Sequence, residues 1–181
     1  MKKTNTTRFA KTALAVSKLT KQPVIYSDVN GAHTIACSYL FLRTDSAQAA
    51  QTILARIPAS HLKIDCGIHS QAERILQGSK NRQTLTNSGI VVEGQYAYRR
   101  FLYGNDFVVT INDDYLYTFD GDYHFLAGDG SNSPVIVFGS DYIAGILPLA
   151  HRSNDAALAT MHRVIERSGY KPINEEVPTH G

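Results

Sequence analysis

The chain has 181 residues, of which 43% are hydrophobic and 19% are charged, and its formal net charge at pH 7 is +2. This length and composition are those of a globular chain with a hydrophobic core, and they exclude the disordered class. The longest apolar runs fall far short of the roughly 18–20 residues that cross a membrane. Residues Thr4–Arg8 are polar where a signal peptide needs an apolar segment. We therefore expect a cytoplasmic protein with no membrane contact.

Catalytic and metal-binding patterns are missing from the sequence. It has no serine-hydrolase elbow, no zinc-protease motif and no phosphate-binding glycine loop. Cys37 and Cys66 lack the spacing of a redox or zinc pair, which predicts buried free thiols in a reducing compartment. The histidines have no cysteine or carboxylate at ligand spacing. We expect a protein that is not an enzyme and that holds no metal or cofactor.

The charges are distributed unevenly along the chain. Residues 1–22 contain no acid and carry Lys2, Lys3, Arg8, Lys11, Lys18 and Lys21. Residues 105–141 contain no lysine or arginine and carry Asp106, Asp113, Asp114, Asp120, Asp122, Asp129 and Asp141. The first region attracts phosphate and the second repels it. The alternative interpretation is that both are ordinary solvated faces.

The basic region coincides with a predicted amphipathic helix over Thr7–Thr20. At about 100° per residue, the apolar side chains that gather on one face are Phe9, Ala10, Ala13 and Val16. The basic side chains on the other face are Arg8, Lys11, Lys18 and Lys21. Such a face suits the phosphate backbone of DNA, because it supplies charge without contacting base edges.

The following elements are predicted from periodicity and turn residues. Pro23 ends the helix, a strand begins at Val24, and Asn30-Gly31 predicts a tight hairpin. The next segments are an apolar strand at His33–Leu42, a helix at Ser46–Arg56, a strand at His61–Ile64 and a helix at Ser70–Leu76. Gly78–Gly89 is predicted as an exposed connection, followed by strands at Ile90–Glu93 and Tyr96–Tyr103. Arg99 and Arg100 are expected to point to opposite faces of that strand.

The segment Phe107–Leu149 predicts a strand, a short helix and three more strands. Asn112 is the expected N-cap, because two acids that complement the helix dipole follow it. The helix face consists of Tyr115, Leu116 and Phe119. The strands are predicted at Phe107–Ile111, Tyr123–Ala127, Pro134–Phe138 and Tyr142–Leu149.

The C-terminal region predicts one amphipathic helix and a loose tail. The helix spans Asn154–Arg167, with Asn154 as the cap and Ser168-Gly169 at its end. Its apolar stripe consists of Leu158, Met161, Val164 and Ile165. This stripe packs either on its own domain or on another chain. The tail spans Tyr170–Gly181 and contains two prolines.

The order of these motifs resembles a domain of the DNA sliding clamps of bacteria and phages. In the second half the matching residues are Asn112, Tyr115, Leu116, Ser133-Pro134-Val135 and Ile146-Leu147-Pro148-Leu149. In the first half they are Pro23-Val24-Ile25 and the Asn30-Gly31 turn after a helix. The resemblance covers about residues 5–150. It departs from the family at Ser38, Leu40 and Phe41, where clamps have Asp, His and Arg.

The resemblance implies an α+β fold, with a single sliding-clamp-like domain over residues 1–150, an added C-terminal helix over 151–169 and a flexible tail over 170–181. It also implies a processivity factor in DNA replication that binds duplex DNA without sequence specificity. The expected DNA-binding residues are Arg8, Lys11, Lys18 and Lys21. A DNA polymerase or another clamp-binding protein would bind a hydrophobic groove bordered by Leu40, Leu42, Leu147, Pro148 and Leu149.

One such domain is too small to encircle DNA, so the resemblance further implies a homo-oligomer. The alternative is a clamp-fold interaction module or clamp mimic, from a phage or plasmid, that does not bind DNA. The altered loop at Ser38–Phe41 and the acidic second half favour this alternative.

Overall fold

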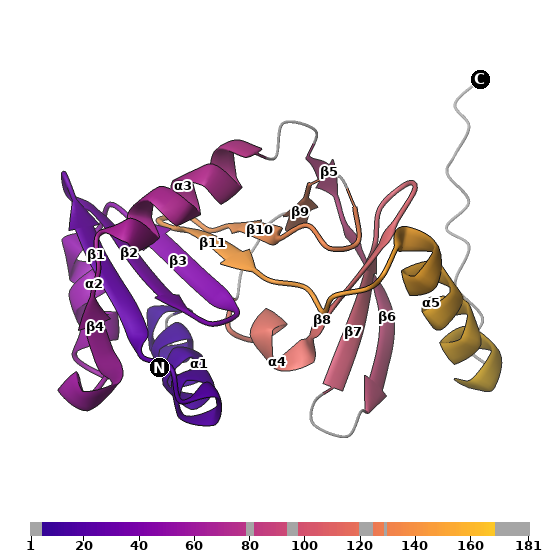
Figure 1. Ribbon diagram of the computed structural model, residues 1–181, viewed down its shortest axis with the longest axis horizontal. Coiled ribbons are helices and arrows are strands. Elements are labelled where there is room, and N and C mark those ends of the chain that lie inside the picture. The colour runs from indigo at the N-terminus through magenta and orange to yellow at the C-terminus, as the bar shows by residue number, and fades with distance from the viewer. Residues whose placement is uncertain (1–4, 79–81, 94–97, 120–124, 129, 169–181) are drawn as a thin grey trace.

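The computed structural model describes residues 5–78, 82–93, 98–119, 125–128 and 130–168. These residues form a large mixed sheet with helices on both faces and a small antiparallel sheet covered by a C-terminal helix (Figure 1). The predicted α+β class with an added C-terminal helix is confirmed.

The large sheet has the strand order β4-β1-β2-β3-β11-β10-β9-β5. All neighbouring strands are antiparallel except β1 and β4, which are parallel. The bounds are β1 Val24–Val29, β2 Ala32–Cys37, β3 Leu40–Thr44, β4 Leu62–Ile64, β5 Gln83–Thr84, β9 Phe125–Ala127, β10 Val135–Phe138 and β11 Ile143–Ile146.

The centre of the large sheet is built from two similar units. In the first, helix α1 (Asn5–Thr20) precedes the antiparallel strands β1, β2 and β3, and in the second, helix α4 (Asp113–Leu116) precedes β9, β10 and β11. The last strands of the two units, β3 and β11, pair antiparallel, with Leu42 opposite Ala144. The six strands β1-β2-β3-β11-β10-β9 are therefore arranged with an approximate local two-fold symmetry.

Strand alternation divides the apolar side chains between the two faces of this sheet. Ile35 and Leu42 join α1, α4 and helix α2 (Ala47–Leu54) in the largest hydrophobic cluster. Phe41 and Ile136 point to the other face, where helix α3 (Gly67–Gly78) covers them. Any side chain at Gly145 would overlap the Phe41 ring across the β3–β11 pair. The sheet thus separates α1 and α4 from α3 (Figure 1).

The small sheet consists of β6 (Thr86–Glu93), β7 (Tyr98–Tyr103) and β8 (Val108–Asn112). Helix α5 (Asn154–Ser168) packs on one face of it, at the far end of the molecule from α1 (Figure 1). The residues in this contact are Ile90, Phe101, Val108, Ala157, Leu158, Met161, Val164 and Ile165. The predicted apolar stripe of α5 therefore packs on its own chain, which is the first of the two alternatives drawn from the sequence.

The predicted cap of α5 is wrong by one residue. The hydroxyl of Ser153 accepts the amide of Ala156 at 3.2 Å. Asn154 instead ties the helix to the small sheet, because its side chain accepts the Val108 amide and donates to the Asp106 carbonyl at 2.7 Å.

The first hairpin forms as predicted, with Asn30 at φ 53° and Gly31 at φ 81°, both in the left-handed region that this turn requires. The single strand predicted over His33–Leu42 is wrong. Cys37 pairs with Leu40, so the two residues between them turn the chain and separate β2 from β3. No glycine or proline marks this turn, which is why the continuous apolar pattern hid it.

Three further predictions are corrected. Residues 82–89 are not simply an exposed connection, because they contain β5, the start of β6 and the buried Leu85. Cys66 is exposed, whereas Cys37 is mostly buried. The predicted helix around Tyr115 closes only one turn. Residues 79–81, Gly169 and the tail at 170–181 lie outside the described residues.

Within the described ranges, no helix combines the length and the apolar character needed to cross a membrane.

Candidate nucleic-acid interface and hydrophobic pocket

Helix α1 buries one face and presents lysines on the other. Phe9 and Ala13 are fully buried against the sheet, and Lys11 and Lys18 are exposed about half a turn away from them. The helix contains no acidic residue. Within the described part of the chain, no carboxylate lies at ion-pair distance from either lysine. These two charges are therefore directed to solvent.

The other two predicted DNA-binding residues lie at the edges of this face. Arg8 is half-buried, and its Nη1 donates to the carbonyl oxygen of Tyr117 at 3.5 Å. Lys21 follows the last turn of α1 at φ 56° and is exposed. The structure thus places Arg8, Lys11 and Lys18 on one side of a single helix, with Lys21 just beyond its C-terminal end.

The one-turn helix α4 lies directly beside α1. Thr12 and Thr118 share a hydrogen bond of 2.9 Å, and the rings of Phe9 and Phe119 are 6.3 Å apart. Asn112 caps α4 by accepting the Asp114 amide at 3.0 Å, as its sequence position predicts. Helix α4 and the residues that follow it, as far as Phe119, therefore pack along α1.

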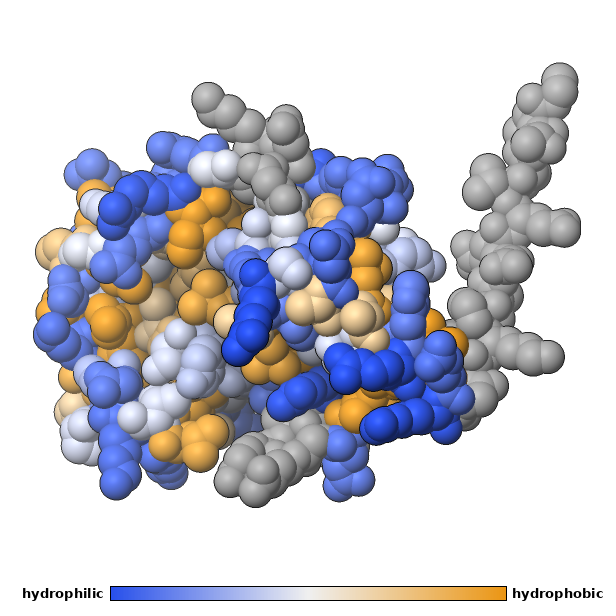
Figure 2. All heavy atoms as spheres, turned by 45° about the vertical axis from the view of Figure 1, so that its right-hand side comes forward, coloured by the Kyte–Doolittle hydropathy of each residue, from blue (hydrophilic) through white to orange (hydrophobic). Residues whose placement is uncertain are grey.

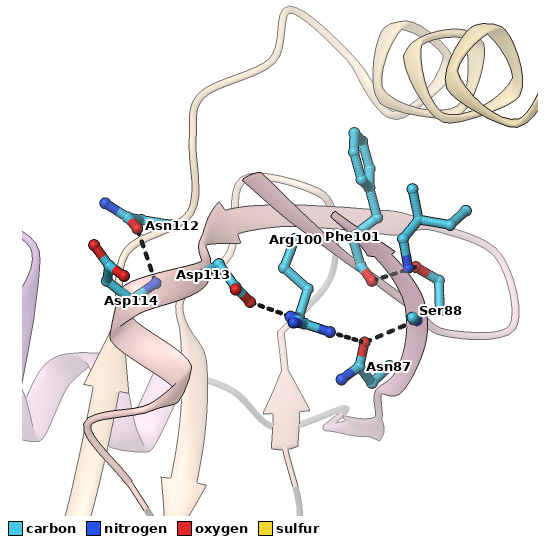
Figure 3. A network of polar contacts seen from close by, with 9 residues as sticks. Asn87, Ser88, Arg100, Phe101, Asn112, Asp113 and Asp114 are labelled. Atoms are coloured by element: carbon cyan, nitrogen blue, oxygen red, sulfur yellow. Dashed lines mark hydrogen bonds and ion pairs between the residues drawn. The ribbon is translucent and has the colours of Figure 1, made fainter. Parts of the chain in front are cut away.

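A partly buried polar network holds the start of α4 against the small sheet (Figure 3). The guanidinium of Arg100 pairs with the carboxylate of Asp113 and donates from Nη1 to Asn87 Oδ1 at 3.1 Å. The hydrogen bond that Arg100 donates to Asp113 raises the pKa of the guanidinium. Arg99 is exposed, so the two arginines do point to opposite faces. One of the two acids of α4 is neutralised, and Asp114 remains exposed.

Two exposed tyrosines in this region were missed by the sequence analysis. Tyr117 is 64% exposed at the C-terminal end of α4. Tyr39 is 42% exposed in the β2–β3 turn and stacks on the ring of Tyr115 with centroids 6.3 Å apart. Burial raises the pKa of Tyr115 to about 12. Ser38, next to Tyr39, donates to the Thr20 hydroxyl at 3.2 Å, which brings this turn to the end of α1.

A small hydrophobic pocket lies on the other face of the large sheet. Its volume is about 140 Å³, and it is bordered by α3, the β2–β3 turn and the segment after β11. The apolar side chains around it are Ala36, Leu40, Phe41, Ile68, Ala72, Ile75 and Leu147. Cys37 also borders it, and burial raises the pKa of this thiol. On the face shown in Figure 2, hydrophobic side chains reach the surface in small groups between hydrophilic ones.

Only some of the residues predicted to border a groove line this pocket. Leu40 and Leu147 line it together, and the Leu147 amide donates to the Tyr39 carbonyl at 2.9 Å. Leu42 is 0% exposed in the main core on the opposite face. Pro148 and Leu149 do not border the pocket, and the Leu149 amide donates to the Thr110 carbonyl at 2.7 Å. Nothing in the sequence predicted that side chains of α3 complete the pocket.

Two larger hollows lie elsewhere. One of about 590 Å³ is bordered by Gly89–Glu93 of β6 and by Val164 and Arg167 of α5. The other, of about 380 Å³, lies between residues 43–46 and 139–143. Across the described ranges, no group of three or more His, Cys, Asp or Glu side chains is placed to hold a metal ion.

No family model, no curated protein and no solved structure matches this chain.

Proposed function

We propose that this chain is a DNA replication accessory protein of the sliding-clamp type, which binds duplex DNA without sequence specificity and recruits a polymerase or another partner. The observation that carries the proposal is the acid-free helix α1, whose exposed Lys11 and Lys18 have no carboxylate partner among the described residues. This helix begins the first of the two similar units of the large sheet, which are joined by the pairing of β3 with β11.

Lysine ammonium groups on an exposed helix suit a protein that moves along DNA. They attract phosphates through charge, and their flexible stems accommodate any local backbone geometry. Contacts to phosphates position a protein on the duplex and carry no sequence information. The proposed interface therefore consists of Arg8, Lys11, Lys18 and Lys21, and it requires no catalytic group, metal or cofactor.

The location of the pocket supports simultaneous recruitment of a partner. Leu147 and α3 border it on one face of the large sheet, and α1 occupies the other face. A hydrophobic peptide anchored there would not compete with DNA on α1. The volume of about 140 Å³ accommodates one or two apolar side chains, which is how short peptides gain most of their affinity in such sites.

Charge reversal on α1 tests the DNA-binding proposal. The triple variant Lys11→Glu, Lys18→Glu, Lys21→Glu should keep its fold, because all three side chains are exposed. Its affinity for a 40-base-pair duplex at low salt should fall at least about tenfold, because phosphate attraction is replaced by repulsion. Fluorescence anisotropy with a labelled duplex measures this change.

A matched control carries the same change of charge elsewhere. Arg152, Arg163 and Arg167 are exposed in or near α5, at the far end of the molecule. Their replacement by glutamate should reduce the affinity much less than the α1 variant does. Equal losses in the two variants would show that only net charge matters, and would remove α1 as the interface.

The pocket is tested with two leucines of equal exposure. Leu147 is 39% exposed and lines the pocket, whereas Leu149 is 38% exposed and does not. Leu147→Asp should abolish capture of a hydrophobic partner peptide, and Leu149→Asp should leave it unchanged. Unfolding of the Leu147 variant, measured by circular dichroism, would instead make this leucine a core residue and end the pocket proposal.

A second candidate function is a clamp-fold interaction module that does not bind DNA. Exposed Asp114 on α4 favours it, because α4 lies beside α1 and this carboxylate repels phosphate. Wild-type protein with no duplex affinity at low salt, but with peptide binding that depends on Leu147, would identify this function.

A further inference from the structure

We propose that the seam between α1 and α4 binds single-stranded nucleic acid, with Tyr117 as the platform on which a base stacks. The proposal rests on the proposed DNA-binding function of α1 and specifies a second substrate class for the same face. It is carried by an exposed aromatic ring on a residue whose backbone carbonyl accepts a hydrogen bond from Arg8 of the basic helix α1.

Tyr117 is unusual among the aromatic residues of this chain in its exposure. It is 64% exposed, whereas Tyr115, two residues earlier on the same short helix, is only 7% exposed. A ring that is 64% exposed buries little apolar surface in the folded state, so it is accessible to a ligand. Tyr117 and Phe119 are only two residues apart, yet only Phe119 packs in the core.

Two arginines interact with Tyr117. Arg8 of α1 donates to its backbone carbonyl at 3.5 Å. The Tyr117 phenol also interacts with the guanidinium of Arg100, which is itself paired with Asp113, and this interaction is one of the smaller causes that raise the pKa of Arg100. The hydrogen bond from Arg8 fixes the Tyr117 backbone, so the residue loses less conformational freedom when a ligand stacks on its ring.

Among the described residues of this face, Arg8, Lys11 and Lys18 outnumber the exposed carboxylate of Asp114, so the net charge favours a polyanion. Arg8 lies on the same side of α1 as Lys11 and Lys18, so a phosphate chain that follows these side chains passes beside the Tyr117 ring. Single-strand binding sites combine this kind of basic track with aromatic platforms, because every base has a face that stacks.

Single-stranded rather than double-stranded nucleic acid fits the ring. In a duplex the base faces are stacked on one another, so an exposed tyrosine contacts only the backbone. In a single strand the bases are free to turn out and stack on aromatic side chains. The lysines of α1 attract the phosphates of either ligand, whereas the Tyr117 ring stacks only on the bases of a single strand.

The test compares a labelled 20-nucleotide deoxythymidine strand with a duplex of the same length, both at low salt. Tyr117→Ala should weaken single-strand binding roughly five- to tenfold and change duplex binding less than about twofold. Tyr117→Phe should restore single-strand binding, since it keeps the ring. Tyr103→Ala is the matched control, because Tyr103 is exposed on β7 and should change neither affinity.

Circular dichroism establishes that each variant is folded before its affinity is measured. Equal loss for both ligands in Tyr117→Ala, or no loss for either, would overturn the single-strand proposal. Wild-type protein that binds the duplex but not the strand would also overturn it and leave the proposed function in place. Protein that binds neither ligand would end both proposals. A Tyr117→Ala variant that loses only the peptide partner would assign the ring to a protein contact and overturn the proposal as well.

Discussion

At the residue scale, hydrogen bonds from both its backbone and its ring fix the position of His151. His151 follows β11 and connects the two sheets. Its backbone exchanges two hydrogen bonds of 2.7 Å with the side chain of Asn132, and its Nε2 lies 3.1 Å from the Thr110 hydroxyl. Burial, and then the positive charge of Arg99, lower the pKa of His151.

The lowered pKa predicts a pH-dependent stability. The folded chain binds a proton on His151 less tightly than the unfolded chain does, so protonation favours unfolding. The contribution is complete above the unfolded histidine pKa of about 6.5 and is lost as the pH falls from there through the lowered folded pKa. Urea denaturation at pH 7.5 and 5.5 should therefore give a smaller difference in stability for His151→Gln than for the wild type.

The control for this measurement is His162→Gln, which changes an exposed histidine on α5. It should keep the wild-type difference between the two pH values. A wild-type difference that also persists in His151→Gln would contradict the role given to this ring.

At the element scale, α5 belongs to the fold because its apolar stripe completes the core of the small sheet. Ala157 is fully buried there, whereas Ala159, on the same helix, is exposed. Asn154 and Ser153 fix the start of the helix to β8 and to its own first turn. The helix is therefore packed within its own chain.

This packing predicts different outcomes for two alanines. Ala157→Asp places a carboxylate in the apolar contact with Phe101 and Val108, and it should lower the free energy of unfolding by about 3 kcal/mol or more. Ala159→Asp should change it by less than about 1 kcal/mol. Thermal and urea denaturation measure both. Equal effects would mean that α5 does not pack on the small sheet in solution.

The elements that could be predicted from sequence are those with strong local signals. The period of α1, the Asn30-Gly31 turn and the Asn112 cap each depend on a few adjacent residues. The β2–β3 turn at Ser38–Tyr39 was missed, because no glycine or proline marks it and apolar residues flank it on both sides. The pairing of Arg100 with Asp113 and the position of α3 over Phe41 depend on long-range contacts that periodicity does not encode.

The same limit applies to the candidate site. The basic face of α1 was predictable, because four charges and the apolar stripe have the same period. Leu42 was predicted to border the groove. Strand alternation instead points its side chain into the main core, on the opposite face of the sheet from Phe41. Tyr117 gave no signal, because its exposure depends on where α4 ends.

At the scale of the whole molecule, the two sheets leave strand edges available for pairing. Among the described residues, β6 is bonded only to β7, and α5 covers a face of this sheet rather than its outer edge. An edge of this length can pair with a strand of another copy. Of the described acids in residues 105–141, the exposed ones are Asp106, Asp114 and Asp141, and α1 is basic.

Self-association is therefore predicted, with the basic N-terminal region of one copy meeting the acidic region of the next. Opposite charges steer such an encounter, and edge-strand hydrogen bonds and apolar contacts supply most of the affinity. Sedimentation velocity should show a species larger than a monomer at low salt, with dissociation as salt increases. A monomer at every concentration, at both low and high salt, would rule out a self-assembled ring.

The most direct test of the proposed DNA-binding role of α1 is the salt dependence of wild-type affinity for a long duplex of random sequence. Each phosphate neutralised by a lysine or arginine contributes about −0.9 to the slope of log affinity against log salt concentration. With Arg8, Lys11, Lys18 and Lys21 at the interface, the slope should be roughly −3 to −4 and independent of sequence. A protein with no affinity for duplex DNA at low salt, or with a slope near zero, would contradict this role.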